Sequence, residues 1–154
     1  MEFKLLASNK KAFRDFHLLE HWECGIALTG SEVKSLRAGG VNFKDSFARM
    51  DGEEVFLYNL FINPYSQAGL NQPESDRARK LLLHKREIGK IIGQVTQKGL
   101  TLIPTKIYFN KRGFAKVEIA LGKPKKLYDK RDDIKKRDLE REMKRTKASH
   151  QKGR

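Results

Sequence analysis

The residues that could perform acid–base, nucleophilic or metal chemistry are few, and their spacing does not suit it. The lone cysteine, Cys24, lies inside an apolar run, where a small buried side chain is its usual role. His17 and His21 are four residues apart, and in a strand that spacing separates them by about 13 Å, too far to share one metal ion. The sequence contains neither a Walker-type phosphate loop nor a G-x-S-x-G nucleophile motif. We therefore expect a protein that is not an enzyme and that holds no metal or cofactor.

Positive charge is the chemical property that dominates the sequence. Its 154 residues include 33 Lys and Arg against 19 Asp and Glu, which gives a net charge of +14. Such an excess favours polyanions, because contacts to phosphates release condensed counterions. Nucleic acid is therefore the first candidate partner. An anionic membrane surface is the second, but no apolar run approaches the roughly 20 residues that span a bilayer.

Two further features indicate where such a protein works. A single cysteine cannot form an internal disulfide, which fits a reducing cytoplasm. The apolar run at the start ends near Ala7 and meets Asn9 and two lysines, so it is too short for a secretory signal. We expect a soluble, cytoplasmic protein.

One stretch, residues 29–40, indicates the element around which the fold is organised. Thr29 and Glu32 have the spacing of a capping box, which marks the start of a helix. Leu36 would face a core, and Gly39 supplies the positive φ that ends such a helix. The apolar run before it is typical of a strand, so we expect a strand, a sharp turn and a short basic helix that closes one end of a sheet or barrel.

The rest of the first 122 residues shows the patterns of strands and hairpins, with one longer helix. Asp51 and Gly52 separate two apolar runs, which is a hairpin signal. Residues 63–76 lack periodicity, which predicts a loop. In residues 78–98 apolar residues recur at helical spacing, which predicts a helix that ends at Gly99. The predicted strands are residues 13–20, 23–28, 41–50, 55–62, 100–109 and 114–121, and residues 1–11 are expected to be loose. This predicts an α+β, mainly antiparallel fold, a small barrel with two or three flanking helices.

The last part of the chain, residues 123–154, has a different composition. It holds 14 Lys and Arg against 6 Asp and Glu, whereas residues 1–122 hold 19 against 13. Beyond residue 129 its large apolar residues are Ile134, Leu139 and Met143. Their spacing is too sparse to dock a helix, so we expect a body and a basic tail that is disordered when free and helical on a polyanion. The alternative is a solvated tail that only improves solubility.

Four blocks of sequence, in order along the chain, resemble one known family. Residues 9–12 read NKKA, residues 22–47 read WECGIALTGSEVKSLRAGGVNFKDSF, residues 77–85 read RARKLLLHK, and residues 125–131 read KKLYDKR. Together with the spacing between them, these blocks run from about Asn9 to about Arg137. They resemble the family of small protein B (SmpB), which binds transfer-messenger RNA and acts in ribosome rescue.

The resemblance implies a fold and a function. SmpB proteins are small antiparallel barrels of the oligonucleotide/oligosaccharide-binding type, with flanking helices and a basic tail. They bind the tRNA-like domain of transfer-messenger RNA and deliver it to the empty A site of ribosomes stalled on truncated messages. The implied partners of this chain are transfer-messenger RNA and small-subunit rRNA at the decoding centre. The resemblance also implies that the protein is a monomer and has no membrane partner.

The resemblance also implies RNA-binding residues in the body. Asn9 would hydrogen-bond phosphate or ribose, and Leu82 would pack against an unstacked base. Glu23 would bind a base edge or a 2′-OH, or orient a neighbouring cation. The phosphate contacts around them would come from Lys10, Lys11, Arg79 and Lys80. For Leu82 a place in the core is physically just as plausible, and each of the cations is more often a solvated surface charge.

In the tail, the block at 128–131 matches the family segment that reaches the decoding centre. Tyr128 would stack on a ribosomal base, and Lys130 and Arg131 would hold rRNA phosphates. A helix over residues 134–145 would lie in the vacant message channel, and an occupied channel would exclude it sterically. The implied decoding-centre and channel contacts are Tyr128, Asp129, Lys130, Arg131, Ile134, Lys135 and Lys136.

The chain departs from the family pattern near the junction of body and tail. Family members carry a flexible glycine where this chain has Pro124, and its own glycine, Gly122, stands two residues earlier. Because proline fixes φ at about −65°, we expect a stiffer or displaced hinge. Phe16 stands where the family usually has a tyrosine, and Cys24 where it usually has an alanine.

Three other functions stay open on sequence grounds. The first is a generic OB-fold ribosomal or initiation-type RNA-binding protein with a basic tail. The second is an RNA-processing enzyme that uses barrel carboxylates such as Glu23 or Asp45. The third is a weak binder of membrane surfaces. A rescue factor needs both body and tail, a generic binder loses affinity in proportion to the charge removed, and an enzyme turns over RNA.

Overall fold

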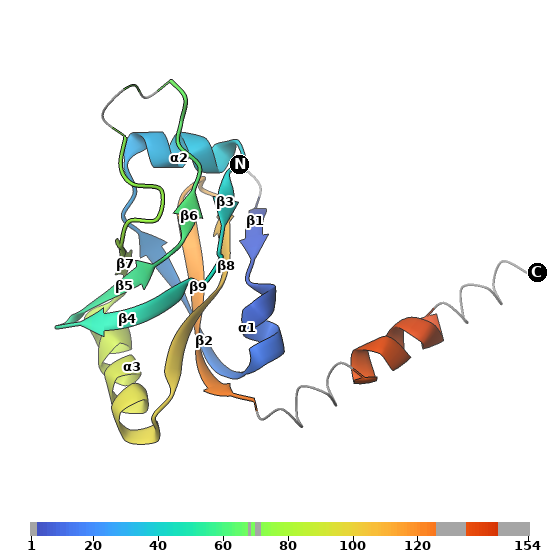
Figure 1. Ribbon diagram of the computed structural model, residues 1–154. Coiled ribbons are helices and arrows are strands. Elements are labelled where there is room, and N and C mark those ends of the chain that lie inside the picture. The colour runs from blue at the N-terminus through green and yellow to red at the C-terminus, as the bar shows by residue number, and fades with distance from the viewer. Residues whose placement is uncertain (1–2, 68, 70–71, 126–134, 145–154) are drawn as a thin grey trace, which may run out of the picture.

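The computed structural model describes residues 3–67, 69, 72–125 and 135–144, which form two antiparallel sheets with flanking helices (Figure 1). The strands of the larger sheet are β1 (Lys4–Ser8), β2 (Phe16–Ile26), β4 (Phe47–Asp51), β5 (Glu54–Tyr58), β7 (Arg79–Leu82), β8 (Thr101–Phe109) and β9 (Ala115–Pro124). The smaller sheet pairs β3 (Val41–Asn42) with β6 (Phe61–Ile62). The helices are α1 (Lys10–Asp15), α2 (Gly30–Arg37) and α3 (Lys85–Lys98), and residues 135–144 are also helical.

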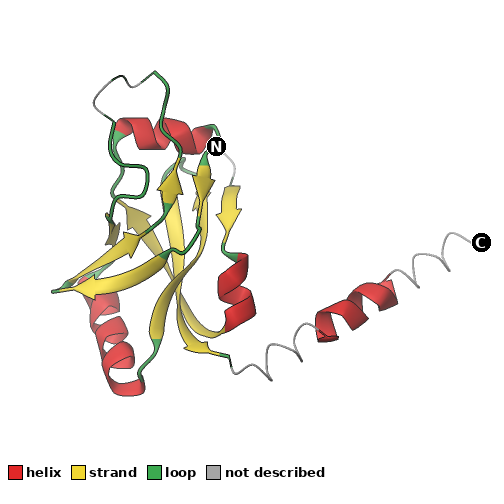
Figure 2. Ribbon diagram, in the orientation of Figure 1, coloured by secondary structure: helices red, strands yellow, loops and turns green. Residues whose placement is uncertain are grey.

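The larger sheet has seven strands in the order β1-β8-β9-β2-β7-β5-β4. Long, strongly twisted strands form its centre, while α2 lies across one end and α3 lies toward the other (Figure 2). The α+β class with mainly antiparallel strands is therefore confirmed. Within the described residues no ladder joins the edge strands β1 and β4, so hydrogen bonds do not close this sheet into the predicted barrel.

Along the central strands, side chains that point into the core alternate with side chains that point to the opposite face of the sheet. The core-facing residues of β2, β8 and β9 are Cys24, Ile26, Ile107, Phe109, Val117, Ile119 and Leu121, all buried in one cluster. The prediction of a buried Cys24 is confirmed, and burial raises the pKa of its thiol to about 12. The thiol is thus protonated at neutral pH, which fits a packing role rather than nucleophilic chemistry.

The predicted helix after residue 28 is confirmed as α2, together with its cap. The Thr29 side chain accepts a hydrogen bond from the Glu32 amide, and the Glu32 carboxylate accepts one from the Thr29 amide. Leu36 is fully buried, and Gly39 has a φ of +82° at the end of the helix. This short segment specifies its own boundaries, since both capping partners lie within it.

The N-terminal prediction was wrong. The segment at 1–11, expected to be loose, contains β1, which pairs with β8. The strand expected at 13–20 starts instead as α1, and β2 runs without a break through the two strands expected at 13–20 and 23–28. The reason is that β1 depends on a partner strand about a hundred residues away, which no local pattern reveals.

The helix expected at 78–98 begins later than predicted. Its first residues form β7, which pairs with β2 and β5, and the helix α3 starts at Lys85. Leu81 fits a period of two as well as a helical period, so the ladders on both sides of β7 decide its conformation. The end of the helix is confirmed, because Gly99 adopts the left-handed conformation with a φ of 62°.

Both predicted hairpins are present. Strands β4 and β5 pair around Gly52, and β8 and β9 pair around the turn at 110–113. The strands expected at 41–50 and 55–62 are each broken in two, with Lys44 at a φ of 42° and Asn59 at a φ of 62°. At these breaks the chain passes between the smaller and the larger sheet.

The junction between body and tail differs from the hinge expected there. Gly122 is buried within β9, and a Cβ atom added to it would lie 2.4 Å from Ile103 Cδ1 and 3.3 Å from Phe16 Cβ. The strand continues to Pro124, which pairs with Phe16, and the Lys125 amide donates to the Asp15 carbonyl. Gly122 therefore allows close packing, and strand β9 continues past residue 122, where the boundary was predicted.

Candidate nucleic-acid interface

The side of the larger sheet that faces away from the core carries the polar residues of four strands. We call it the outer face. Its residues are His21, Glu23 and Gly25 of β2, Lys80 and Leu82 of β7, Lys106 and Tyr108 of β8, and Lys116 and Glu118 of β9. They alternate with the buried residues of the same strands, so period-two geometry places them together.

The strand register brings two of the predicted RNA-binding residues into neighbouring rows of the outer face. Gly25 lies opposite both Leu82 and Lys116. In the next row, Glu23 lies opposite Glu118. Residues that pair directly across antiparallel strands have Cβ atoms about 5 Å apart. Glu23 and Leu82, distant in sequence, therefore belong to one surface.

Leu82 is an exposed apolar side chain on this face, not a core residue. It is 52% exposed, and a Cβ atom at Gly25 would lie 3.1 Å from Leu82 Cβ, so the glycine leaves space for the leucine to lean across β2. Beside them is a hollow of about 380 Å³ that is also lined by Phe114, Arg37 and Lys116. Phe114 is 61% exposed. Exposed apolar side chains next to cations are what an unstacked base and its phosphate require.

Sequence reasoning missed Phe114, Arg37 and Lys116 as members of this surface. The available signal was an aromatic residue directly after the hairpin turn at 110–113, because loops run over the surface and a residue next to a turn lies close to solvent. The contribution of α2 through Arg37 depends on how the helix sits on the sheet, which the sequence does not reveal.

The two carboxylates of the outer face each have partners. The Tyr108 hydroxyl donates a hydrogen bond to Glu23 Oε2. Glu118 Oε2 accepts a 2.6 Å hydrogen bond from the Thr105 hydroxyl, and His21 Nδ1 and Lys106 Nζ lie 3.6 and 3.9 Å from its carboxylate. Like charges that face each other across strands repel, and these donors and cations offset that repulsion.

The Asn9 side chain is used within the protein. The residue is 7% exposed, its Oδ1 accepts from the Ala12 amide at the start of α1, and its Nδ2 donates to the Pro104 carbonyl at 2.8 Å. These contacts fix α1 against β8. Lys10 and Lys11 follow on the exposed surface of α1, where Lys11 forms a 3.2 Å ion pair with Asp45 that water screens strongly.

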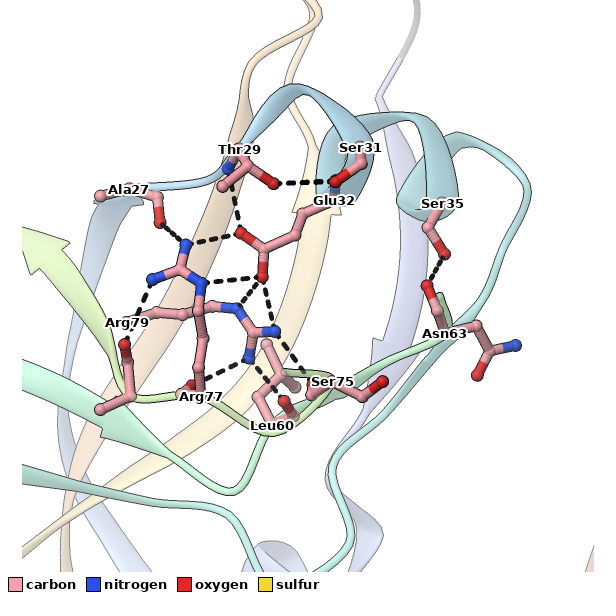
Figure 3. A network of polar contacts seen from close by, with 11 residues as sticks. Ala27, Thr29, Ser31, Glu32, Ser35, Leu60, Asn63, Ser75, Arg77 and Arg79 are labelled. Carbon is pink, nitrogen blue, oxygen red and sulfur yellow. Dashed lines mark hydrogen bonds and ion pairs between the residues drawn. The ribbon is translucent and has the colours of Figure 1, made fainter. Parts of the chain in front are cut away.

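The expected phosphate contact of Arg79 is wrong. Arg79 is 0% exposed, because adjacent residues of a strand point to opposite faces and Lys80 is the one that points outward. Its guanidinium donates to Glu32 Oε2 at 2.6 Å and to the carbonyls of Leu60 and Ser75 at 2.6 and 3.0 Å (Figure 3). Lys80 is exposed and pairs with Glu54 at 2.9 Å.

Arg79 belongs to a polar cluster that ties α2 to β7 and to the segment before it (Figure 3). Arg77 Nη2 lies 2.5 Å from Glu32 Oε1, so two guanidinium groups hold one buried carboxylate. Burial alone would raise the pKa of Glu32, but the hydrogen bonds from both arginines and from a backbone amide outweigh it and hold the pKa below its ordinary value. The cluster is structural, and it fixes α2 beside the outer face.

A second exposed surface lies on the hairpin of β4 and β5. The rings of Phe47 and Tyr58 stack with centroids 5.1 Å apart, and the Arg49 guanidinium lies 5.0 Å from the Tyr58 ring centre. The neighbouring hollow, about 560 Å³, is lined mostly by apolar residues of β4, α3, β8 and the link between the last two. Sequence alone did not reveal that these aromatic side chains share one surface.

Most of the expected tail contacts lie outside the described residues, namely Tyr128, Asp129, Lys130, Arg131 and Ile134. Lys135 and Lys136 belong to the helix at 135–144, in which every side chain is exposed. This includes Leu139 and Met143, at 54% and 55% exposure.

No group of three His, Cys, Asp or Glu side chains that could hold a metal ion occurs among the described residues. None of the helices in that part of the chain is long and apolar enough to cross a membrane.

Comparison with known proteins gives one consistent result. Residues 6–149 match the family described as SmpB protein. The chain is 58% identical over 140 residues to an SsrA-binding protein of Thermosipho melanesiensis, with 91% of this chain and 95% of the relative covered. It is 52% identical over 151 residues to an SsrA-binding protein of a Geobacillus species, with 98% and 97% covered.

A solved structure described as "tmRNA-SmpB: a journey to the center of the bacterial ribosome" is also similar. Its chain is 52% identical to this one, with a TM-score of 0.65, and the match covers 79% of this chain and 85% of that chain. Sequence and fold thus agree on the same relatives.

Proposed function

The chain belongs to the SmpB protein family, and on this premise we propose that its outer face holds the tRNA-like domain of transfer-messenger RNA. It is a non-enzymatic SsrA-binding protein of trans-translation, with transfer-messenger RNA and the ribosome as its partners. What the family assignment leaves open is which surface does which task, and the geometry of the sheet supports one answer.

The observation that carries the proposal is the composition of the outer face. It combines the exposed apolar side chain of Leu82 with the cations Lys80 and Lys116, and the exposed Phe114 lines the hollow beside it. Apolar groups can pack on an unstacked base while the cations neutralise its phosphates. Glu23 stands in the same surface and adds a hydrogen-bond acceptor, which can select a base edge or a ribose hydroxyl.

We propose Lys10 and Lys11 on α1 as further phosphate contacts, and we assign Asn9 the role of fixing that helix. Arg79 supports the surface from inside by holding α2 and β7 together. The finer shape we propose is the OB-like barrel of the family, a body through Lys125 followed by the basic tail. The protein works in the cytoplasm as a monomer.

For the tail we propose the role that the family resemblance implies. Tyr128 stacks on a base of the decoding centre, Lys130 and Arg131 hold rRNA phosphates, and the helix through Lys135 and Lys136 occupies the vacant message channel. The exposure of every side chain at 135–144 supports this, because such a helix offers its charges to a polyanion. The tail thereby senses that the message is missing.

Replacing Lys80 by alanine is expected to weaken binding of the tRNA-like domain and to lower the slope of log affinity against log salt by about 1, because one phosphate contact is lost. Affinity is measured by filter binding over a range of salt concentrations. The matched control is Lys90→Ala, which removes an exposed lysine of α3 that is not a member of the outer face and should leave the slope unchanged.

Equal slopes for the Lys80 and Lys90 variants would contradict this assignment of the outer face. If both variants also bound unrelated RNA with the same affinity as the tRNA-like domain, the chain would be acting as the generic RNA-binding protein that its charge alone allows.

A further inference from the structure

We propose that Tyr108 is a positioning residue that presents the Glu23 carboxylate to a neutral hydrogen-bond donor of the bound RNA. This inference rests on the proposed function, because it assumes that the outer face holds the tRNA-like domain. It goes further by naming a residue outside the expected set, and it keeps for Glu23 the donors that the resemblance implies: a 2′-hydroxyl, or an amino or imino group at a base edge.

The contact itself joins strands that are not adjacent. Tyr108 lies in β8 and Glu23 in β2, with β9 between them, and Lys116 is the residue of β9 opposite Tyr108. The Tyr108 hydroxyl reaches over this strand to donate to Glu23 Oε2. Among the described residues, no other hydrogen bond or ion pair reaches the Glu23 carboxylate. One oxygen is therefore held and the other, Oε1, is left to accept.

The surroundings of Tyr108 make its hydroxyl a fixed and permanent donor. Tyr108 is only 6% exposed, and the Phe3 ring packs on it with ring centroids 4.9 Å apart. Burial, together with the Glu23 carboxylate, raises the pKa of Tyr108, so the hydroxyl keeps its proton at neutral pH. Because the Tyr108 ring is buried and fixed, the hydrogen bond from its hydroxyl restricts the rotamers of Glu23. Without that bond the exposed Glu23 side chain would rotate freely.

An ionised carboxylate on an RNA-binding surface needs such an arrangement. It repels phosphates, so its value lies in accepting hydrogen bonds from donors that are not charged. Fixing one oxygen aims the second and lowers the entropy lost on binding. Glu118, the carboxylate opposite, already accepts from Thr105 and lies near His21 and Lys106, so it is less available for the same task.

The test is a double-mutant cycle on the full chain, with a transcribed tRNA-like domain as the probe. Tyr108→Phe removes the hydroxyl and keeps the ring, and Glu23→Gln removes the charge and keeps the shape. Each single variant is expected to weaken binding about tenfold, the size of one hydrogen bond to a charged group. The double variant should be no weaker than Glu23→Gln alone, because Tyr108 acts through Glu23.

Two controls separate this from a loss of folding. Tyr65→Phe removes another hydroxyl that donates to a side chain, here Gln67, and should leave binding unchanged. Thermal unfolding is recorded for every variant. If Tyr108→Phe lowered the melting temperature strongly, Glu23→Asp would replace it as the test variant. The shorter aspartate keeps the charge at an exposed site but moves the carboxylate away from the Tyr108 hydroxyl. This variant should bind RNA as weakly as Glu23→Gln.

The outcomes are distinct. If Tyr108→Phe bound like the wild type, or if its loss were undiminished in the Glu23→Gln background, the inference would be overturned while the proposed function stood. If the wild type did not prefer the tRNA-like domain over an unrelated duplex of equal length, the proposed function itself would fail. Both results come from the same titrations.

Chemically altered probes then identify the donor. The wild type and Glu23→Gln are compared on RNAs with single 2′-deoxy substitutions and on RNAs with inosine in place of single guanosines. A position where the deoxy substitution weakens only the wild type identifies a 2′-hydroxyl, and the same result for inosine identifies the guanine amino group. If no substitution discriminated between the two proteins, Glu23 would read neither a 2′-hydroxyl nor a guanine amino group, and the inference would be overturned for these two donors.

Discussion

Replacing Arg79 by alanine is expected to lower the free energy of unfolding by about 3–5 kcal/mol, the cost of breaking a buried ion pair from one side. The change leaves Glu32 buried with one guanidinium instead of two and removes the donors to the Leu60 and Ser75 carbonyls. Because domains are stable by only about 5–15 kcal/mol, this loss would be a large fraction of the total stability.

The measurement is urea unfolding at neutral pH, followed through the fluorescence of the single tryptophan, Trp22. Lys80→Ala is the matched control, since it removes the neighbouring cation from an exposed position and should change stability by less than about 0.5 kcal/mol. Similar stability for the Arg79 and Lys80 variants would contradict the buried role of Arg79 and return it to the list of possible phosphate contacts.

The same cluster predicts how stability depends on pH. The pKa of Glu32 is lower in the folded protein than in the unfolded chain, so its contribution is fully present above the unfolded value of about 4.3. It is lost as the pH falls through the lower folded value. The stability difference between wild type and Glu32→Gln should therefore be constant near neutral pH and shrink in acid, and a difference that grew in acid would oppose this assignment.

Removing every residue after Lys125 is expected to abolish ribosome rescue while the tRNA-like domain stays bound with less than about a tenfold loss in affinity. The cut is placed there because β9 continues to Pro124 and the Lys125 amide is bonded to Asp15, so a cut at residue 122 would damage the body. Rescue is measured as release of ribosomes stalled on a message without a stop codon, and affinity by filter binding.

The informative control replaces the tail by a permuted sequence of the same composition. It keeps the charge but moves Tyr128 and the following cations, so RNA affinity should return to that of the full chain while rescue stays absent. Recovery of rescue by the permuted tail would mean that charge alone suffices, and the proposed sensing of the decoding centre and channel would be wrong.

Local signals predicted those elements whose partners lie close in sequence. The capping box of Thr29 and Glu32 set α2, the turn at Gly52 set the hairpin of β4 and β5, and Gly99 ended α3. Strand β1 was missed because its stability comes from pairing with β8, far along the chain. The start of α3 was missed for a related reason, since Leu81 suits a helix locally but is held in β7 by ladders on both sides.

The site was predictable in its residue types and not in its geometry. Treating residues 78–98 as a helix made Arg79 and Lys80 equivalent neighbours, whereas in a strand they face opposite sides, and only Lys80 reaches the surface. The roles of Tyr108 and Phe114 need the register of β8 and β9, which decides what lies beside Glu23 and Leu82. The charge on the chain predicted an RNA partner but no particular face for it.

The most direct test of the central claim is to recover the protein from cell lysate at moderate salt and sequence the RNA that stays bound, with residues 1–125 treated in parallel. We predict that transfer-messenger RNA dominates both samples, because the body recognises the tRNA-like domain without the tail. A mixture of RNAs that is lost steeply as salt rises would contradict this, since it would show binding through counterion release alone.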